Sequence, residues 1–205
     1  MRPIPIFQNS RKTSEKFLVK IDENSRLFTL FAISMLLTFF CIILLLSVLS
    51  FLSLAPFVPT RSSDLERIAK ILDLKKWEKF LEIGAGTAKV SLFLGKRFPE
   101  SQITGIELSP FFYILAKVRV WFFGTKNVDI LFGDALKKDL WIYDVLYVFG
   151  LPETISRKLA PKLLREMKTH SRFFSYCFEM TSSDFLQKKH KESPEILAIY
   201  EYTKK

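Results

Sequence analysis

Acidic residues stand at the ends of short apolar segments in the part of the chain after residue 60. Glu82 and Glu107 lie at or near the ends of two such segments, Asp134 follows a third, and Gly84 and Gly86 follow the first. If these segments are parallel strands, their carboxyl ends meet at one edge of a sheet, where such folds bind ligands. Carboxylates there attract cationic groups, and glycines let a ligand approach the backbone closely. The spacing therefore predicts a ligand-binding site.

The carboxylate of Glu82 distinguishes two nucleotide ligands. A dinucleotide-binding turn has a third glycine where this chain has Lys89, and a carboxylate at position 82 would repel the pyrophosphate of NAD. The same carboxylate would attract the ammonium and sulfonium groups of S-adenosylmethionine. Glu107 is placed to bind ribose hydroxyls, and Asp134 to bind the adenine amino group. These positions predict S-adenosylmethionine as the cofactor, with local helix capping or ion pairing by Glu82 as the alternative.

Alternating strands and helices are predicted to position these residues. From residue 59 onward, short apolar strands alternate with amphipathic helices, which predicts an α/β fold with a doubly wound, mostly parallel sheet. The first helix is predicted to begin with a capping box formed by Ser63 and Glu66. Lys188, Lys189 and Lys191 are expected in a solvated basic loop. The predicted strands are residues 80–83, 102–108, 128–132, 144–149, 172–178 and 196–202, and the predicted helices begin near residues 64, 87, 110 and 153.

A long uncharged segment precedes this alternation. No charged residue lies between Leu27 and Thr60, and a bilayer span needs about 20 apolar residues. A cleaved signal peptide has an apolar core of about 7–15 residues, whereas this segment is longer, begins later and ends in prolines. We therefore expect a basic N-terminal tail over residues 1–26, one transmembrane helix over 27–57 and a cofactor-binding domain over 58–205.

The formal net charge of +10 indicates an anionic partner. Basic residues are in excess on both sides of the apolar segment, so the positive-inside rule leaves its orientation open. The cytosolic supply of the cofactor favours a catalytic domain on the cytoplasmic side in a prokaryote. Beside a membrane span, the excess suits anionic lipid headgroups, at about 1 kcal/mol per well-placed basic residue.

Cysteine and histidine are too few to build a scaffold. The chain has two cysteines, Cys41 and Cys177, and two histidines, His170 and His190, all far apart in the sequence. This excludes a disulfide framework and predicts no metal site. Half of the residues are hydrophobic, at 49%, which excludes an intrinsically disordered chain.

The sequence resembles a known family. Residues 57–202 look like a class I S-adenosylmethionine-dependent methyltransferase with a shortened Rossmann-like fold, whose first motif matches residues 81–86 and whose second matches residues 105–108. Residues 57–60, 107–110 and 148–152, together with the apolar segment, are similar to the membrane-anchored protein-lysine methyltransferases of the adenine nucleotide translocase and the ATP synthase c-subunit, and to their small prokaryotic relatives. Two departures are Thr87-Ala88-Lys89, where a further glycine is usual, and a short segment 135–140 after the third strand. Ala88 fits the turn if its φ is negative.

The resemblance implies roles for named residues. The expected reaction is N-methylation of a lysine in a membrane-associated protein, with no residue assigned as a catalytic base. The implied cofactor-binding residues are Glu82, Gly84, Ala85, Gly86, Glu107, Leu108, Asp134 and Phe149, and the substrate-facing candidates are Pro59, Thr60, Phe149 and Pro152.

Two alternative functions stay open. A lipid or quinone could be the acceptor, because the span brings the site to the bilayer, and a non-catalytic module could keep the fold without the reaction. Nucleic acid is not expected, because methyltransferases of base amines carry Asn/Asp-Pro-Pro-Tyr where this chain has residues 149–152. The helix predicted after Pro110 is apolar on all sides, which indicates either burial or docking on a bilayer or a partner.

Overall fold

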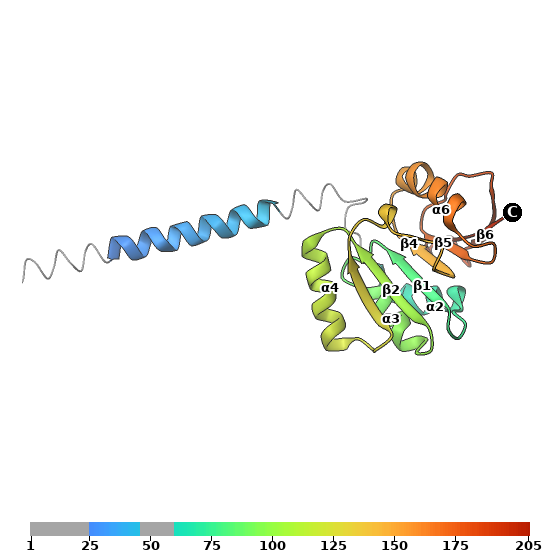
Figure 1. Cartoon of the computed structure of the whole chain (residues 1–205), viewed down its shortest axis with the longest axis horizontal. Coiled ribbons are helices and arrows are strands. Elements are labelled where there is room, and N and C mark those ends of the chain that lie inside the picture. Colours follow the sequence, from blue (N-terminus) through green and yellow to red (C-terminus); the bar gives the residue numbers. More distant parts are fainter. Residues whose placement is uncertain (1–24, 46–59) are drawn as a thin grey trace, which may run out of the picture. The chain divides into compact units, whose positions relative to one another are not determined.

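The computed structural model describes residues 25–45 and 60–205 of the chain (Figure 1). The chain divides into two compact units, Met1–Ser47 and Val48–Lys205. Most of the predicted N-terminal tail, the end of the predicted span at residues 46–57, and Pro59 lie outside the described residues.

The described part of the first unit is one helix, Ser25–Leu45, of 21 residues. At 1.5 Å per residue it is about 30 Å long, which matches the hydrocarbon core of a bilayer. The hydroxyls of Thr29 and Thr38 donate to the carbonyls of Ser25 and Ser34, each over 2.8 Å, so these polar groups are satisfied within the helix. By length and composition, this helix can cross a membrane.

The second unit is built on a seven-stranded sheet with the order β3-β2-β1-β4-β5-β7-β6. Neighbouring strands from β3 to β5 run parallel, and β7 is antiparallel to both β5 and β6. The strand order reverses between β1 and β4, which is where such sheets bind ligands. The predicted doubly wound, mostly parallel sheet is confirmed. The strands are β1 Lys79–Ile83, β2 Gln102–Glu107, β3 Val128–Phe132, β4 Val145–Val148, β5 Arg172–Tyr176, β6 Phe185–His190 and β7 Ile199–Lys204.

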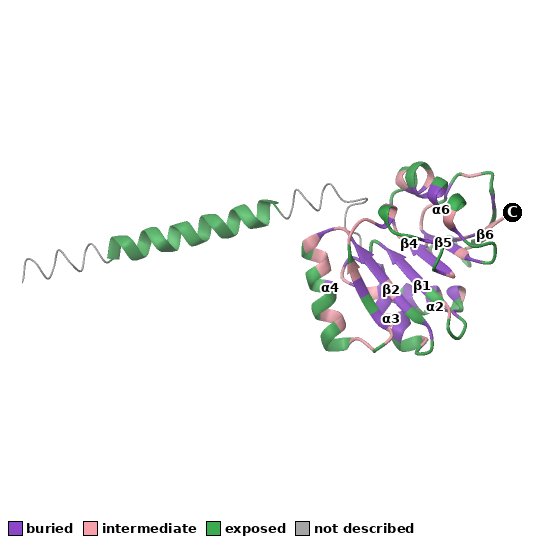
Figure 2. Cartoon of the chain, in the orientation of Figure 1, coloured by how far each residue is buried: buried purple, intermediate pink, exposed green. Residues whose placement is uncertain are grey.

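Helices cover both faces of the sheet, and the central strands β1, β2, β4 and β5 are mostly buried (Figure 2). Side chains alternate between the faces, so Phe80 of β1 packs with the helices that precede and follow that strand, whereas Leu81 packs with the helix after β4. The segment after β3 holds one short turn, as predicted. The helical elements are η1 Ser62–Asp64, α2 Leu65–Leu72, α3 Lys89–Arg97, α4 Pro110–Phe123, η2 Ala135–Lys137 and the continuous run α5 Pro152–Thr154, η3 Ile155–Leu159 and α6 Ala160–Glu166.

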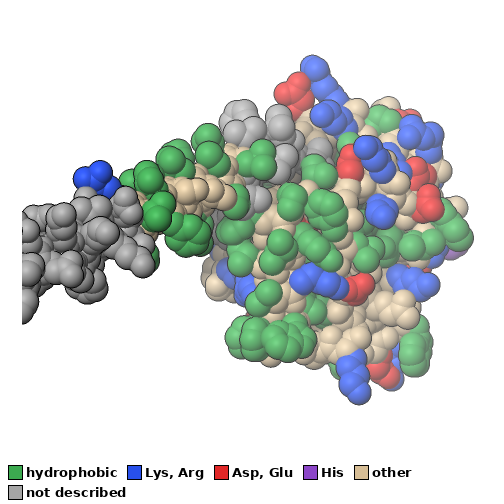
Figure 3. Space-filling model, turned by 60° about the vertical axis from the view of Figure 1, so that its left-hand side comes forward, with side chains coloured by type: hydrophobic (Ala, Val, Ile, Leu, Met, Phe, Trp, Pro, Cys, Tyr) green, Lys and Arg blue, Asp and Glu red, His purple; other side chains and the backbone are tan. Residues whose placement is uncertain are grey.

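Hydrophobic side chains gather on the surface of the domain on its α4 side (Figure 3). Most large side chains of α4 are exposed, and Ala116 is its one buried residue. Of the two outcomes predicted for this apolar helix, burial is therefore only partial, because α4 leaves most of its apolar surface exposed.

The predicted capping box at Ser63 is wrong. The turn η1 leads into α2, and no side chain caps either element. Asp64 is buried instead, and its Oδ2 accepts hydrogen bonds from the hydroxyl of Tyr176 at 2.5 Å and from Arg67 at 3.3 Å. The Asp64 carboxylate at the start of this helix therefore bonds to a residue of β5, which the local sequence does not reveal.

The predicted basic loop is also wrong in part. Lys188 and Lys189 lie in β6, and Lys191 follows it. This strand forms the edge of the sheet and buries only Phe185, so its sequence lacks the apolar alternation of a half-buried strand. Exposed lysines on an edge strand oppose pairing with another chain.

Gly95 lets α3 lie close to the start of β3. A Cβ atom at this position would come within 2.1 Å of Val128 Cγ2 and 2.9 Å of Thr125 Oγ1. Both distances are far below contact distance, so the helix or the strand would have to shift.

We predict that Gly95→Ala destabilises the domain by about 1–3 kcal/mol through overpacking, despite the helix propensity of alanine. Thermal unfolding of the full chain in detergent measures the effect. Lys96→Ala, at the exposed neighbouring position, is the control and should leave the melting temperature nearly unchanged. Equal melting temperatures for the two variants would contradict the close packing.

Candidate cofactor-binding site

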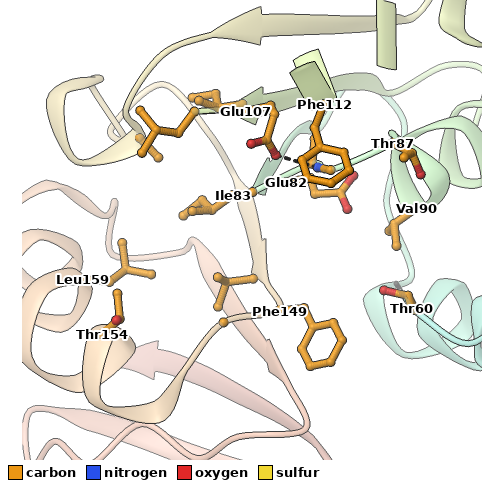
Figure 4. Close-up of a pocket in the computed structure, with 18 of the residues that line it drawn as sticks. Thr60, Glu82, Ile83, Thr87, Val90, Glu107, Phe112, Phe149, Thr154 and Leu159 are labelled. Carbon is orange, nitrogen blue, oxygen red and sulfur yellow. Dashed lines mark hydrogen bonds between the residues drawn. The ribbon is translucent and has the colours of Figure 1, made fainter. Parts of the chain in front are cut away.

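A pocket opens at the carboxyl ends of β1, β2 and β4 (Figure 4). Most of the residues expected from the sequence line it. Asp134 and Pro152 do not, although Gly133 and Ala135 do, and Pro59 lies outside the described residues. The expected residues that line the pocket are Thr60, Glu82, Gly84, Ala85, Gly86, Glu107, Leu108 and Phe149.

Glu107 holds two turns together at the centre of the pocket. Its Oε2 accepts a hydrogen bond from the backbone N–H of Gly86 at 2.7 Å, and its Oε1 accepts one from Ser109, also at 2.7 Å. The first bond fixes the glycine turn after β1, and the second fixes the start of α4. A carboxylate can accept about four hydrogen bonds, so Glu107 keeps the capacity to bind further donors.

Glu82, near the end of β1, is buried and also lines the pocket. Its Oε2 accepts hydrogen bonds from the backbone N–H of Ser91 at 3.0 Å and from the Ser91 hydroxyl at 2.5 Å. Ser91 lies in the first turn of α3, where the N–H groups have no partner within the helix, so Glu82 caps this helix. The local capping alternative is therefore present, and Glu82 also lines the pocket.

The burial of Glu82 changes its acidity. Burial raises the pKa of Glu82 to about 8, the two Ser91 hydrogen bonds oppose this rise, and the nearby Glu107 carboxylate adds to it. A buried carboxylate with such a pKa is poised to ionise when a cationic group binds beside it.

The turn between β1 and α3 has a left-handed backbone at three positions. The φ angles of Gly84, Gly86 and Ala88 are +77°, +54° and +58°. Glycine adopts this conformation without cost, whereas Ala88 pays about 1 kcal/mol. The expectation of a negative φ for Ala88 is wrong, because Ala88 is the N-cap residue of α3 and has a left-handed backbone there.

Gly105 of β2 lets the glycine turn and α3 lie close to that strand. A Cβ atom there would come within 2.8 Å of Ala85 Cβ, 2.8 Å of Ile130 Cδ1 and 3.2 Å of Ser91 Oγ. The third glycine of a dinucleotide-binding turn permits close approach of helix and strand. In this chain, the glycine that permits the close approach belongs to the neighbouring strand.

Several pocket residues were not predicted from the sequence. Lys89 lines the pocket and donates a hydrogen bond from Nζ to the carbonyl of Thr60 at 2.6 Å, which ties residue 60 to the glycine turn. Phe112, in the first turn of α4, lies over the pocket close to Glu107 (Figure 4). Lys89 and Phe112 follow predicted turns closely, and this position could have indicated that they line the pocket. Apolar lining residues such as Leu159 have no such feature in the sequence.

Asp134 caps the short turn η2. Its Oδ1 accepts a hydrogen bond from the backbone N–H of Leu136 at 2.9 Å. Leu136 lines the pocket, so Asp134 shapes this wall through its neighbours. Direct binding of adenine by Asp134 stays a prediction.

Solved structures share this fold. The RNA methyltransferase from Salinibacter ruber, in complex with S-adenosyl-L-homocysteine, is 19% identical, with a TM-score of 0.64 over 71% of this chain and 93% of that chain. A mutant of MtNAS in complex with S-adenosylmethionine is 18% identical, with a TM-score of 0.59 over 69% of this chain and 60% of that chain. The precorrin-6y C5,15-methyltransferase from Geobacter metallireducens is 16% identical, with a TM-score of 0.56 over 74% and 92%. None of the curated proteins compared with the chain matches it.

We predict that Glu82→Gln flattens the pH dependence of stability. The folded-state pKa of about 8 lies above the ordinary value of 4.5, so the native chain loses stability as pH rises between these values. Glutamine cannot ionise, and its carbonyl can still accept from Ser91. Melting temperatures of both proteins between pH 5 and 9, in steps of about one unit, measure the difference. Glu100→Gln, at an exposed position, is the control and should keep the pH dependence of the native chain. If Glu82→Gln also keeps that pH dependence, the pKa of Glu82 is not raised and the prediction is wrong.

A family model connects the fold and the pocket to an activity. The model of the ANTKMT methyltransferase domain matches residues 82–186, half of the chain. The matched region begins at Glu82 and includes Glu107, Phe149 and the strands β2 to β5. The expectation of a class I methyltransferase is confirmed. The chain belongs to the ANTKMT methyltransferase domain family and is an S-adenosylmethionine-dependent methyltransferase.

Proposed function

We propose that this methyltransferase N-methylates a lysine of a membrane protein while the helix Ser25–Leu45 anchors it in the bilayer, with its catalytic domain on the cytoplasmic side. One observation carries the proposal. A pocket built around Glu82 and Glu107 lies in a domain of the ANTKMT methyltransferase family, and that domain follows a helix long and apolar enough to cross a membrane.

The pocket suits the chemistry of S-adenosylmethionine. Both Ser91 hydrogen bonds go to Oε2 of Glu82, which leaves Oε1 to accept from an ammonium group. The oxygens of Glu107 keep lone pairs for the hydroxyls of a ribose. The turn over residues 84–86 exposes backbone without bulky side chains, since a Cβ atom at Gly84 would meet nothing within 4 Å. The donor and acceptor set therefore supports binding of a cationic nucleoside.

The protein's contribution to the reaction is positioning. When bound, S-adenosylmethionine supplies the methyl group and leaves as a neutral thioether. The acceptor amine must reach the site uncharged, and partial desolvation at the pocket lowers its pKa. Holding both partners in line can provide much of the rate enhancement, so the chain needs no dedicated base beside the methyl group.

Phe149 and Thr60 are proposed to form the wall on the acceptor side. The ring of Phe149 meets that of Tyr176 edge-on, with centroids 4.8 Å apart, and stacks on Phe178 at 6.3 Å. These contacts fix Phe149 at the end of β4, where it lines the pocket (Figure 4). A fixed aromatic wall next to the methyl group would orient an aliphatic amine by contact.

Calorimetry of the full chain in detergent tests cofactor binding. We predict that Glu107→Ala weakens the affinity for S-adenosylmethionine by roughly 10-fold to 100-fold, because charge-assisted hydrogen bonds contribute about 1.5–3 kcal/mol. Glu100→Ala removes an exposed carboxylate and is the matched control. Glu107→Gln, which keeps one acceptor oxygen, should lie between the two, and melting temperatures show whether each variant is folded. Tight binding of NAD by the native chain would contradict the cofactor assignment.

Methyl transfer from radiolabelled S-adenosylmethionine to membrane fractions tests the acceptor. We predict that the label appears in acid-stable methyl-lysine and is lost with Glu107→Ala. Label that extracts into organic solvent would contradict the proposal in favour of a lipid or quinone acceptor. Native chain that binds the cofactor and transfers no label to any fraction would instead indicate a non-catalytic module.

A further inference from the structure

The outer face of α4 is a continuous apolar surface. Six residues spaced three or four apart project from the side of the helix that does not meet the sheet, since residues at this spacing share one face of a helix. We call them the outer face of α4. They are Phe111, Ile114, Leu115, Val118, Trp121 and Phe122, all exposed.

The opposite side of the helix is the one that packs on the domain. Ala116 is fully buried, and Tyr113 and Val120 pack against the cluster of Ala85, Ala88, Leu92 and Ile130. All six side chains of the outer face are exposed, and Trp121 is 79% exposed. Figure 3 shows the hydrophobic side chains that gather on this side of the domain. A soluble surface rarely exposes so much contiguous apolar area, so this one indicates a binding surface.

The charges around the outer face indicate what covers it. The sequence of α4 contains no acidic residue, and Lys117 and Arg119 lie on the two flanks of the face. Asp129 pairs with Lys117 at 2.9 Å, at the edge of the helix. A second copy of the chain would bring like basic flanks together, whereas an anionic lipid surface would complement them.

We propose that the outer face of α4 docks into the headgroup region of an anionic bilayer. Interfacial helices present an apolar face with aromatic residues to the lipid and basic residues to the headgroups. Trp121, near the end of the helix, is of a type that concentrates at membrane–water interfaces, and Phe122 is of a type that interfacial helices present to lipid. The inference rests on the membrane anchoring stated under the proposed function.

The chain length favours this occupant over a soluble one. The segment 46–59 between the two described parts has about 14 residues, which can span at most about 50 Å even when fully extended. A domain behind an anchor helix is therefore kept near the bilayer, where the lipid surface is present at high local concentration.

Docking of α4 would also position the active site. Phe112, one residue after the start of the outer face, lines the pocket. Arg119 donates from Nη1 to the carbonyl of Thr87 at 2.9 Å, and Ser109 donates to Glu107. These bonds join the helix rigidly to both turns of the pocket. A docked α4 would hold the pocket beside the membrane surface, within reach of a lysine at the lipid boundary.

Tryptophan fluorescence tests the docking in the full chain. The three tryptophans of the chain are Trp77, Trp121 and Trp141, so the anchor contributes none. The double variant Trp77→Phe/Trp141→Phe keeps only Trp121, and Trp121→Phe/Trp141→Phe keeps only Trp77, which is 76% exposed and lies outside α4. Both are reconstituted into vesicles of phosphatidylcholine and phosphatidylserine that carry brominated acyl chains.

We expect brominated lipid to quench Trp121 by about twofold or more, because an interfacial helix buries its apolar face about 5–10 Å into the headgroup boundary, and to leave Trp77 unquenched. Val118→Glu, added to the chain that keeps Trp121, should abolish the quenching, whereas Lys126→Glu in the following loop should reduce it less. Trp121 that is quenched neither by brominated lipid nor by aqueous iodide would show that protein covers this face, and would overturn the proposal. Quenching by iodide alone would overturn it as well.

Methyl transfer separates the two proposals. Val118 does not line the pocket, so the Val118→Glu variant should still bind S-adenosylmethionine. Label in methyl-lysine with unquenched Trp121 would overturn the docking and leave the proposed function standing. Quenched Trp121 without any transfer of label would support the docking and contradict the proposed function.

Discussion

The buried carboxylate of Glu107 is the constraint on which the site depends. A buried charge is tolerated only when it is hydrogen-bonded, and here the donors are the backbone N–H groups of Gly86 and Ser109. One donor belongs to the turn after β1 and the other to the start of α4. A single side chain therefore fixes the glycine turn, the end of β2 and the first turn of α4 relative to one another. The pocket has its shape because this carboxylate must be satisfied.

A second buried carboxylate makes the same pocket electrostatically incomplete. The charge of Glu107 contributes to the raised pKa of Glu82, after the larger effect of burial. Two carboxylates at the ends of adjacent strands oppose each other unless a cation lies near them. Such an arrangement lowers the stability of the protein without ligand and favours binding of a positively charged ligand. Binding sites commonly combine lower stability with function in this way.

The sequence predicts the elements that follow local rules and misses those set by distant contacts. Strands β1 to β5 are short segments rich in apolar residues, and Glu82 and Glu107 stand at predicted strand ends, so the fold class and the carboxylates of the pocket follow from the sequence. The capping box predicted for Ser63 and Glu66 is absent, and a contact distant in sequence lies there instead, in which the Asp64 carboxylate accepts from the hydroxyl of Tyr176. β6 was missed because an edge strand with one buried residue has no apolar pattern. The apolar wall near Leu159 could not be predicted, since hydrophobic residues look alike whether they line a pocket or a core.

Helix α4 shows where composition and structure inform each other. Its sequence alone allows burial or docking, because a helix apolar on all sides fits both. In the fold, α4 lies beside β3, the strand at one edge of the sheet, so it has one side to pack and one side left over. The inner side packs through Ala116, Tyr113 and Val120, whereas the outer face leaves Trp121 and Phe122 exposed. A helix that only had to pack on the sheet would have polar residues on its outer side. The exposed apolar side chains of the outer face of α4 therefore argue for a contact outside the domain.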